Sequence, residues 1–456
     1  MEDRTPSSIE PMTEAVQAYL ANAQLDELRA VINDFHPADI ADILDALPGE
    51  AALQVFALLT DEVASEVLDE TGSLIRAELV EKVDDERLAD LLDELPMDDA
   101  AEFLDDLPDA TADRLLGLME PDEAQDVREI LSYQVETAGR LMTRDVAALR
   151  RMWTVAEALE YLRSLVVTDE TETVHYLYVV DRDERLIGVV PIRQLLLAQP
   201  DVTIESIMVP EAITIEDSAD QEELAELVSK YDFVAIPVVD NEGHLLGVVT
   251  VDDVLDIVEE EATEDIQRLG GSEPLAQPYF SVSILQVFGK RLVWLLPLFV
   301  ASIVTDSIVQ SYNWLTVAFV SLTIFFPVVI GTAGNAGSQT VATIIRGIAV
   351  GEIRLPDLGR ALSREAVIGL LLGLALGAAG FVRAIVLNTS TDIALVLAIT
   401  LPLVVIWANV VATLVPLVAE RLRIDPAVVS TPMITTIVDA SGMMIYLTLA
   451  AFFLQS

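Results

Sequence analysis

The sequence predicts a multidomain protein: an all-α superhelical N-terminal domain, then an α/β tandem repeat, then an all-α domain with five transmembrane helices. Three observations predict this order. Helix breakers recur roughly every twelve residues before position 130, a long phrase is repeated at an offset of 59, and five apolar segments follow position 290. With 456 residues, 52% of them hydrophobic, and a mean hydropathy of +0.47, the chain is more apolar than most soluble proteins.

Charge is distributed very unevenly along the chain. Residues 271–456 hold nine basic and nine acidic side chains, so the other 17 basic and 66 acidic residues, and the whole formal charge of −49, lie in positions 1–270. Such a field repels nucleic acid and anionic lipid and attracts cations. It therefore argues against a nucleic-acid partner, although general solvation in a salty cytoplasm would also suit an acidic surface.

Two further features bear on compartment and chemistry. The chain has no cysteine, which excludes disulfides and thiolate metal sites. The N-terminus "MEDRTPSSIEPM" has no basic region followed by an apolar one, so it is not a secretory signal. We expect the acidic half to stay in the cytoplasm.

The first 130 residues predict short amphipathic helices. Phrases such as "ILDALPGEAALQVFALL" and "LLDELPMDDAAEFLDDL" place a proline or capping residue between two helical patterns. Helices of about nine residues are not stable alone, so they are expected to stack into a superhelical domain. The breakers or capping residues are Pro37, Pro48, Thr60, Gly72, Asp84, Pro96, Pro108 and Pro121.

Residues 138–256 contain a duplication. "LYVVDRDERLIGVVPIRQLLLA" (177–198) matches "IPVVDNEGHLLGVVTVDDVLDI" (236–257), which pairs Asp181 with Asp240 and Gly188 with Gly247. Each copy reads as a β-β-α unit preceded by another helix. This arrangement resembles a tandem pair of CBS modules, whose cleft often holds an adenine nucleotide.

In that family a Gly-h-h-Thr-x-x-Asp phrase, where h is apolar, contacts ribose and phosphate. "GVVTVDD" supplies Thr250 and Asp253 in the second copy, whereas "GVVPIRQ" offers Pro191 and Gln194 in the first. The resemblance therefore implies at most one conventional nucleotide site, with ATP as its possible ligand. A structural pair that binds no nucleotide is the alternative.

An acidic helix is predicted directly after the second module. In "VDDVLDIVEEEATEDIQRLGG" (251–271) carboxylates recur at helical spacing with a single arginine near the end. Like charges one turn apart destabilise a helix, so this segment needs cations or a partner.

Five apolar segments follow, at about 291–310, 314–345, 366–387, 393–419 and 427–454. Each exceeds or approaches the roughly 20 residues that span a bilayer. The basic residues Lys290 and Arg291, Arg346 to Arg364, and Arg421 and Arg423 fall on one side, and only Arg383 falls on the other. The positive-inside rule places the N-terminus in the cytoplasm and the C-terminus outside.

The last segment carries a carboxylate, Asp439, about 12 residues from its start and so roughly 18 Å along a helix. A charge at this depth costs about 2.5–3.5 kcal/mol on insertion scales, so it requires a functional or structural reason. The residues around it are small or hydroxylic, as in a helix that packs closely and lines a wet path. A protonated Asp439 bonded to a neighbouring helix is the structural alternative.

The second segment contains "FPVVIGTAGNAGSQT". Its glycines allow close packing or an exposed backbone, while Asn335, Ser338, Gln339 and Thr340 add neutral oxygens that suit a hydrated hard cation.

Together these features strongly resemble the MgtE family of magnesium channels, over essentially the whole chain, with "GTAGNAGSQ" and "PMITTIVDASG" as the specific phrases. The resemblance implies a Mg²⁺-selective channel or transporter of the plasma membrane, gated by intracellular Mg²⁺ and not an enzyme. It also implies a homodimer whose pore lies on the two-fold axis between the second and fifth segments. The expected domains are 1–135 (helical, acidic), 136–250 (CBS pair), 251–272 (connecting helix) and 273–456 (transmembrane).

The same resemblance assigns the metal ligands. Asp439 is the central pore site, with Asn335, Ser338, Thr431 and Thr435 contacting the ion through water or carbonyl groups. Ser338 and Thr431 stand where the family commonly has asparagine. The cytosolic sensor comprises Asp253, Asp256, Glu261, Glu264 and Asp265 on the connecting helix, Glu222 and Asp232 on the second CBS module, and Asp98 and Asp99 on the N-terminal domain. Mg²⁺ keeps several waters and is usually held by one or two carboxylates, so paired aspartates suit it.

Three other functions compete with this interpretation. A divalent-cation exchanger or cotransporter would use the same residues. An intramembrane aspartyl hydrolase would use Asp306 and Asp439, but the Tyr-Asp and Gly-x-Gly-Asp phrases of such enzymes do not occur. A nonconducting nucleotide sensor leaves Asp439 unexplained. Three scattered histidines do not support soluble catalysis.

Overall fold

The computed structural model describes residues 9–168, 173–275, 279 and 282–454. The chain forms two compact units, unit 1 (1–260) and unit 2 (261–456), and the division falls within one helix, α15 (Val251–Leu269). The two units have separate hydrophobic cores.

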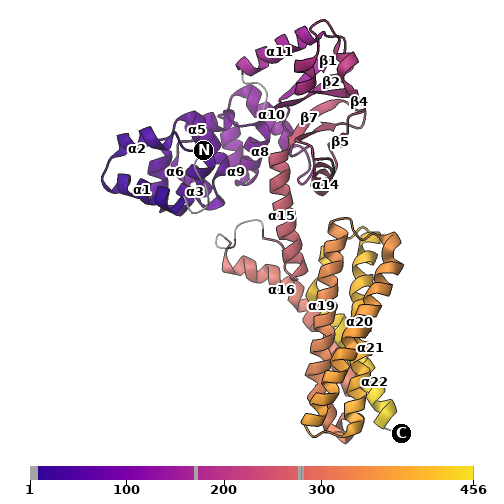
Figure 1. Cartoon of the computed structure of the whole chain (residues 1–456). Coiled ribbons are helices and arrows are strands. Elements are labelled where there is room, and N and C mark those ends of the chain that lie inside the picture. Colours follow the sequence, from indigo (N-terminus) through magenta and orange to yellow (C-terminus); the bar gives the residue numbers. More distant parts are fainter. Residues whose placement is uncertain (1–8, 169–172, 276–278, 280–281, 455–456) are drawn as a thin grey trace. The chain divides into compact units, whose positions relative to one another are not determined.

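Residues 9–131 of unit 1 fold into ten short helices (Figure 1). They are α1 (Ile9–Ala21), α2 (Leu25–Ile32), α3 (Pro37–Ala46), α4 (Gly49–Phe56), α5 (Asp61–Glu70), α6 (Ser73–Lys82), α7 (Asp85–Asp93), α8 (Met97–Asp105), α9 (Asp109–Leu116) and α10 (Pro121–Leu131). The predicted all-α domain is confirmed.

The breakers predicted from sequence all fall at helix starts. Pro37 and Pro121 occupy the first turns of α3 and α10, where the missing amide proton would have no partner in any case. The other six breakers immediately precede α4 to α9. Because each helix is stopped after two to three turns, α3 packs on α5, α5 on α7 and α7 on α9, which makes a superhelical stack.

The tandem repeat forms two small sheets, ordered β1-β2-β3-β4 and β5-β6-β7. The first module comprises β1 (Val146–Arg150), α11 (Val155–Thr168), β2 (Thr173–Val180), β3 (Leu186–Pro191) and α12 (Ile192–Leu197). The second comprises α13 (Ile204–Ile207), β4 (Val209–Pro210), β5 (Ile215–Glu216), α14 (Gln221–Tyr231), β6 (Ala235–Val239) and β7 (Leu245–Thr250). In both modules the central hairpin is antiparallel and the preceding strand joins it in parallel.

The matched aspartates of the two copies accept equivalent hydrogen bonds. Oδ1 of Asp181 accepts hydrogen bonds from two backbone amides in the β2–β3 turn, and Oδ1 of Asp240 does so in the β6–β7 turn. The modules also exchange segments: β4 of the second copy pairs with β3 of the first, and Thr143, which precedes β1 in the first copy, bridges to Val248 in the second. A side chain at Gly247 would meet the Thr143 carbonyl oxygen at 2.4 Å, so the exchange requires glycine there.

Five helical spans long and apolar enough to cross a membrane occur in the described part of unit 2. The first, Ile284–Ser311, consists of α16 (Ile284–Ala301) and α17 (Ile303–Ser311), and the short α18 (Asn313–Ala318) follows it. The others contain α19 (Phe326–Ala349), α20 (Leu358–Val386), α21 (Thr391–Arg421) and α22 (Thr431–Leu454). Three 3₁₀ turns, Val320–Phe325, Leu355–Asp357 and Pro426–Val428, precede α19, α20 and α22. The predicted number of spans is confirmed, although the third begins about ten residues earlier than predicted.

Helix α21 is the centre of the bundle, because α19, α20 and α22 all pack along it (Figure 1). A row of glycines on α20 makes its contact with α21 unusually close: a Cβ atom at Gly373 would lie 2.4 Å from Cα of Pro402, and one at Gly377 would lie 2.6 Å from the Ala398 carbonyl oxygen. Small residues at four-residue spacing allow membrane helices to approach in this way.

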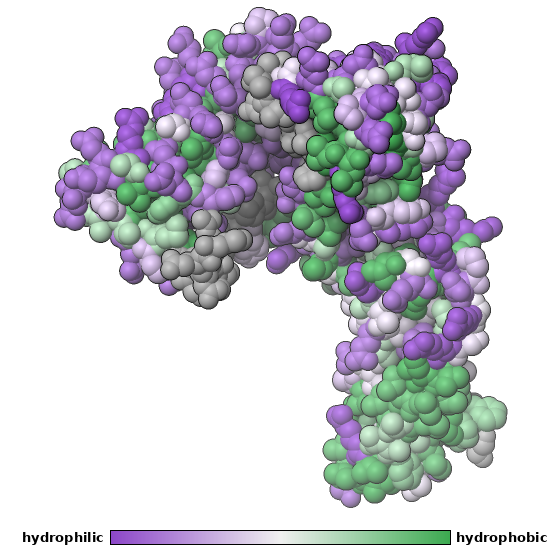
Figure 2. All heavy atoms as spheres, turned by 45° about the horizontal axis from the view of Figure 1, so that its top comes forward, coloured by the Kyte–Doolittle hydropathy of each residue, from purple (hydrophilic) through white to green (hydrophobic). Residues whose placement is uncertain are grey.

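The outer surface of unit 2 is apolar. No residue of α16 is buried, and α20 exposes leucines such as Leu371 and Leu374. In Figure 2 a continuous hydrophobic surface covers the lower end of the molecule, whereas hydrophilic residues cover most of unit 1 on the face shown. Apolar patches of this extent mark a membrane or partner surface.

Candidate functional site

Asp439 lies on α22 opposite the glycines of α19. It is half-buried, and its Oδ1 atom is buried with no hydrogen-bond partner among the described residues. A Cβ atom at Gly334 would be 3.7 Å from that oxygen and 3.4 Å from Cγ2 of Thr435. The missing side chain at Gly334 therefore leaves space directly beside the carboxylate.

The other predicted pore residues lie on two polar faces. Thr431, Thr435 and Asp439 follow one another at four-residue spacing on α22, and all three are half-buried. Asn335 and Gln339 are exposed on α19, with Ser338 half-buried between them. Because α19 packs along α22, one side of this helix pair is lined with amide, hydroxyl and carboxylate oxygens.

Asp306 does not join this site. It is exposed on α17, and no hydrogen bond links it to Asp439. An aspartyl hydrolase needs two carboxylates that share a proton. The described geometry gives no support to that alternative.

A cluster of three polar side chains, Thr340, Glu365 and Asn409, lies between α19, α20 and α21, and the sequence did not predict it. Oε2 of Glu365 accepts hydrogen bonds from Oγ1 of Thr340 at 3.2 Å and from Nδ2 of Asn409 at 3.1 Å. Asn409 is only 1% exposed, and its amide also donates to the Glu365 carbonyl oxygen. Polar residues that bond across helices in this way hold a membrane bundle together.

The start of α15 brings acidic residues of unit 1 together. Oδ2 of Asp253 accepts from the hydroxyl of Thr250 at 2.7 Å and from its amide at 3.2 Å. Burial raises the pKa of Asp253 to about 6, even though the Thr250 hydrogen bonds lower it. Burial also raises the pKa of Asp256, with Glu259 and Asp252 adding to the effect.

Two carboxylates of the N-terminal helices face this part of α15. Burial and the neighbouring Glu102 raise the pKa of Asp69 to about 6, and Asp253 contributes to the same rise. Burial raises the pKa of Glu102 as well, and Asp256 adds to it. Sequence reasoning missed Asp69 and Glu102, because helices α5 and α8 must be packed before their carboxylates meet α15.

The remaining predicted sensor residues of unit 1 lie on separate elements. Asp98 is buried in the first turn of α8, one helical turn before Glu102, and Asp99 is half-buried beside it. Glu222 is exposed in the first turn of α14, and Asp232 is exposed at its C-cap with φ of 54°. These four residues keep their assignment as a prediction.

The end of α15 belongs to unit 2 and contacts the approach to α22. Arg268 pairs with Glu264 and, at 2.5 Å, with Oδ2 of Asp425. Burial and the Asp425 carboxylate raise the pKa of Asp265 to about 6, and Glu261 adds to this rise. Asp425 also caps the turn before α22, so this cluster joins the connecting helix to the helix that carries Asp439.

Among the described residues, no three histidine, aspartate or glutamate side chains converge as a preformed metal site. The acidic groups instead lie near one another with raised pKa values, an arrangement that favours binding of a proton or a cation. Mg²⁺ retains much of its water shell, so carboxylates that are not preformed into one site can still bind it through bridging water.

A small aromatic cavity of about 40 Å³ lies between the two modules. The first module lines it with Tyr176, Tyr178 and Val189, and the second with Ile213, Phe233 and Pro237. The hydroxyl of Tyr178 is buried there without a partner among the described residues. Ala235, which also lines the cavity, pairs with Thr250 across β6 and β7. The cavity therefore adjoins Thr250, one of the two predicted nucleotide residues.

Comparisons with known proteins agree along the whole chain. Residues 35–136 match the family described as MgtE intracellular N domain, residues 138–201 and 204–260 match CBS domains, and residues 326–449 match the family described as Divalent cation transporter. These matches identify the tandem repeat as the predicted CBS pair.

Two relatives and one solved structure are informative. The magnesium transporter MgtE of Thermus thermophilus is 37% identical over 98% of this chain and 99% of its own length, and that of Enterococcus faecalis is 33% identical over 73% of each. A crystal structure of the cytosolic domain of the Mg²⁺ channel MgtE in complex with ATP covers 54% of this chain and 99% of its own, with 38% identity and a TM-score of 0.51. On this evidence the chain belongs to the MgtE family.

Proposed function

We propose that this protein is a Mg²⁺ channel of the plasma membrane, gated by intracellular Mg²⁺, with its N-terminus in the cytoplasm and its C-terminus outside. The single observation that carries the conduction role is Asp439: a half-buried carboxylate in an apolar span, with Oδ1 unpartnered and facing the space left by Gly334. The identity of the ion as Mg²⁺ is inferred from the family to which the chain belongs.

The chemistry of this group suits a hydrated divalent ion. An unpartnered carboxylate in a membrane is costly unless a cation compensates it. Mg²⁺ dehydrates reluctantly, so hydroxyl and amide groups, here Thr435 and Asn335, serve it by bonding its water shell. Weak contacts of this kind also let the ion leave, which conduction requires.

Flux of Mg²⁺ into liposomes tests the role of Asp439. We expect Asp439→Asn, which keeps the shape of the side chain, to abolish flux, while Asp306→Asn on α17 leaves it close to wild type. Equal flux in Asp439→Asn and wild type would reject the proposal. Insensitivity of the flux to imposed proton and sodium gradients separates a channel from an exchanger or cotransporter.

We also propose a homodimer with the α19 and α22 polar faces on its two-fold axis. Asn335 and Gln339 are exposed on α19 in the single chain, and exposed polar groups at membrane depth normally face protein or water rather than lipid. A second copy would place the same face opposite, so that two Asp439 carboxylates share one ion.

The absence of cysteine from the sequence makes this easy to test. We expect Asn335→Cys, as the single cysteine, to form an intermolecular cross-link under oxidising conditions in membranes. Leu371→Cys, on the lipid-facing side of α20, is the matched control and should remain monomeric. The reverse pattern would place the axis elsewhere.

For regulation we propose that Mg²⁺ binds the acidic residues of α15 and its neighbours. Bound ions neutralise facing carboxylates, such as Asp69 and Asp253, and hold the cytosolic part compact, so that α15 keeps the pore shut. When internal Mg²⁺ falls, repulsion between these carboxylates favours opening. Several weakly held ions supply the few kcal/mol that such a shift requires.

Combined amide substitution of five α15 residues tests this regulation. We expect the variant, Asp253→Asn, Asp256→Asn, Glu261→Gln, Glu264→Gln and Asp265→Asn, to conduct normally but to lose its response to internal Mg²⁺. A control with the same charge change uses exposed residues, Glu27, Glu62, Glu66, Asp109 and Asp122, and should keep the response. Retained inhibition in the α15 variant would refute the assignment.

ATP is the second ligand we propose, between the two CBS modules. The aromatic cavity suits an adenine base. Thr250, which the family phrase assigns to ribose and phosphate together with Asp253, pairs with Ala235 of the cavity lining and donates its hydroxyl to Asp253. The cavity of about 40 Å³ is smaller than adenine, so binding requires the lining side chains to move apart. Titration calorimetry should show ATP binding that Thr250→Val weakens and Thr143→Val does not.

A further inference from the structure

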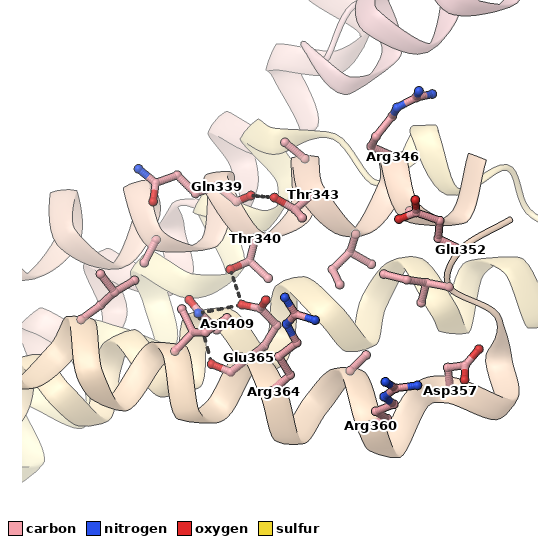
Figure 3. A pocket seen from close by; sticks show the side chains of 18 residues that line it. Gln339, Thr340, Thr343, Arg346, Glu352, Asp357, Arg360, Arg364, Glu365 and Asn409 are labelled. Carbon is pink, nitrogen blue, oxygen red and sulfur yellow. Dashed lines mark hydrogen bonds between the residues drawn. The ribbon is translucent and has the colours of Figure 1, made fainter. Parts of the chain in front are cut away.

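A pocket of about 890 Å³ opens between α19 and α20, and Gln339 of the α19 polar face is among its lining residues. Helix α21 forms its floor, where Asn409 lies, and residues 352–357 of the connection between the two helices close one end. In Figure 3, Arg364 projects into the space between α19 and α20, whereas Arg346 is directed away from α20. The pocket therefore lies at the end of the bundle where the arginines of this connection gather.

The wall formed by α20 changes from cationic to apolar along its length. Arg360, Arg364, Ile368 and Leu372 follow one another at four-residue spacing, so they form one stripe on the helix. The two arginines lie toward the connection, and the two apolar residues lie deeper in the span. Leu372 is 41% exposed, so the apolar end of the stripe is open.

Three carboxylates, Glu352, Asp357 and Glu365, line the same pocket, but none of them pairs with the two arginines among the described residues. In the described part of the chain neither Arg360 nor Arg364 forms an ion pair, and Glu365 is held by Thr340 and Asn409 instead. Two like charges one turn apart destabilise a helix unless an anion lies between them. Guanidinium groups bind phosphate through paired hydrogen bonds, which makes phosphate the fitting anion.

We propose that this pocket binds an anionic phospholipid, with its phosphate between Arg360 and Arg364 and an acyl chain along Ile368 and Leu372. Basic pockets between membrane helices are suited to anionic head groups. The apolar continuation of the stripe selects a lipid over free phosphate. Glu352 and Asp357 lie on the connection, at the end of the pocket near Arg360, where they can accept hydrogen bonds from head-group hydroxyls.

The full-length protein in detergent, supplied with phosphatidylglycerol, phosphatidylcholine or inorganic phosphate, tests this site. Thermal midpoints at increasing phosphatidylglycerol give an apparent affinity, and native mass spectrometry counts the retained lipids. We expect phosphatidylglycerol to raise the midpoint more than phosphatidylcholine does, and inorganic phosphate to have no effect. Each arginine contributes about 1 kcal/mol, so Arg360→Gln/Arg364→Gln should lose about thirtyfold in affinity.

The matched control is Arg421→Gln/Arg423→Gln, which removes two exposed charges outside the pocket and should bind phosphatidylglycerol as wild type does. The single Arg364→Gln variant should lose about fivefold in its affinity for phosphatidylglycerol. It tests the proposal even if the double variant does not fold. Equal responses to the two lipids, an unchanged affinity in the pocket variants, or an equal effect of inorganic phosphate would each overturn the proposal. None of these outcomes depends on Mg²⁺ transport.

Discussion

Unit 1 and unit 2 contain carboxylates in very different settings. In unit 1 they are numerous and lie near one another, as Asp69, Glu102 and Asp253 do, and burial raises their pKa values. In unit 2 they are few, and several have a defined partner: Glu365 accepts from Asn409, and Asp425 pairs with Arg268. Asp439 retains an unpartnered oxygen.

This difference predicts how each unit responds to cations. Where many carboxylates lie near one another, each contributes little and binding is collective. Where the surroundings are apolar, one carboxylate is decisive, because no solvent replaces a lost ligand. Single substitutions should therefore have large effects in the apolar spans of unit 2 and smaller ones in the acidic clusters along α15, and four predictions test this contrast.

The largest effect is expected at the contact between α20 and α21. A side chain at Gly373 would collide with the Pro402 backbone, which cannot move aside, so Gly373→Leu should prevent unit 2 from folding. Gly289→Leu on α16 is the control, since nothing lies within 4 Å of a Cβ atom there. Size-exclusion chromatography of both variants in detergent would show the difference, and a monodisperse Gly373→Leu protein would contradict it.

Next in size is the effect of filling the space beside Asp439. A Cβ atom at Gly334 would make ordinary contacts at 3.4 Å with Thr435, so Gly334→Ala should still conduct. Gly334→Val adds two methyl groups toward the carboxylate and should reduce Mg²⁺ flux more than tenfold while the protein remains folded. If Gly334→Val conducted like Gly334→Ala, the space beside Asp439 would not belong to the ion path.

Stability of unit 1 should depend moderately on pH and Mg²⁺. The folded pKa values of Asp69 and Asp253 rise from 3.8 to about 6, so protonation favours the folded state, and this contribution is lost as pH rises through about 6. Without Mg²⁺ we expect a melting midpoint at least about 3 °C lower at pH 7.5 than at pH 5, and Mg²⁺ should remove the difference.

Asp69→Asn/Asp253→Asn serves as the control for this measurement. The two amides cannot ionise, so the dependence on pH should shrink and Mg²⁺ should raise the midpoint less than in wild type. An equal dependence on pH in both proteins would show that these two residues do not contribute.

The smallest effect is expected for Arg268, which competes with Mg²⁺ for Glu264 and Asp425. Ion pairs near the surface contribute up to about 1 kcal/mol, so Arg268→Gln should lower the internal Mg²⁺ concentration for half-inhibition by up to about fivefold. Flux measured at graded internal Mg²⁺ tests this, with Arg421→Gln as control. A shift to higher Mg²⁺ would mean that Arg268 itself holds the pore shut.

Much of the fold could be predicted because its signals are local. Prolines and capping residues set the helix starts between Pro37 and Pro121, and hydropathy set the number of spans. The glycines of α20, at positions 369, 373 and 377, also have a four-residue spacing that could have been recognised as a packing face.

The site was only partly accessible from sequence. The cost of a charge in an apolar span singles out Asp439 without any structure. By contrast, nothing in the sequence distinguishes Asp69 and Glu102 from the other acidic residues of the N-terminal helices. Thr340, Glu365 and Asn409 lie in three different spans. Nothing in local composition indicates that they meet.

The sequence by itself therefore determined the order of domains, the helix starts between Pro37 and Pro121, the number of spans, the internal repeat and the intramembrane carboxylate, because propensity and hydropathy act between near neighbours along the chain. Only the tertiary structure decided which acids face α15, how the two modules exchange segments around Thr143 and Val248, and where the pocket between α19 and α20 lies. Those outcomes depend on contacts between residues far apart in sequence, which form only when the helices and strands pack.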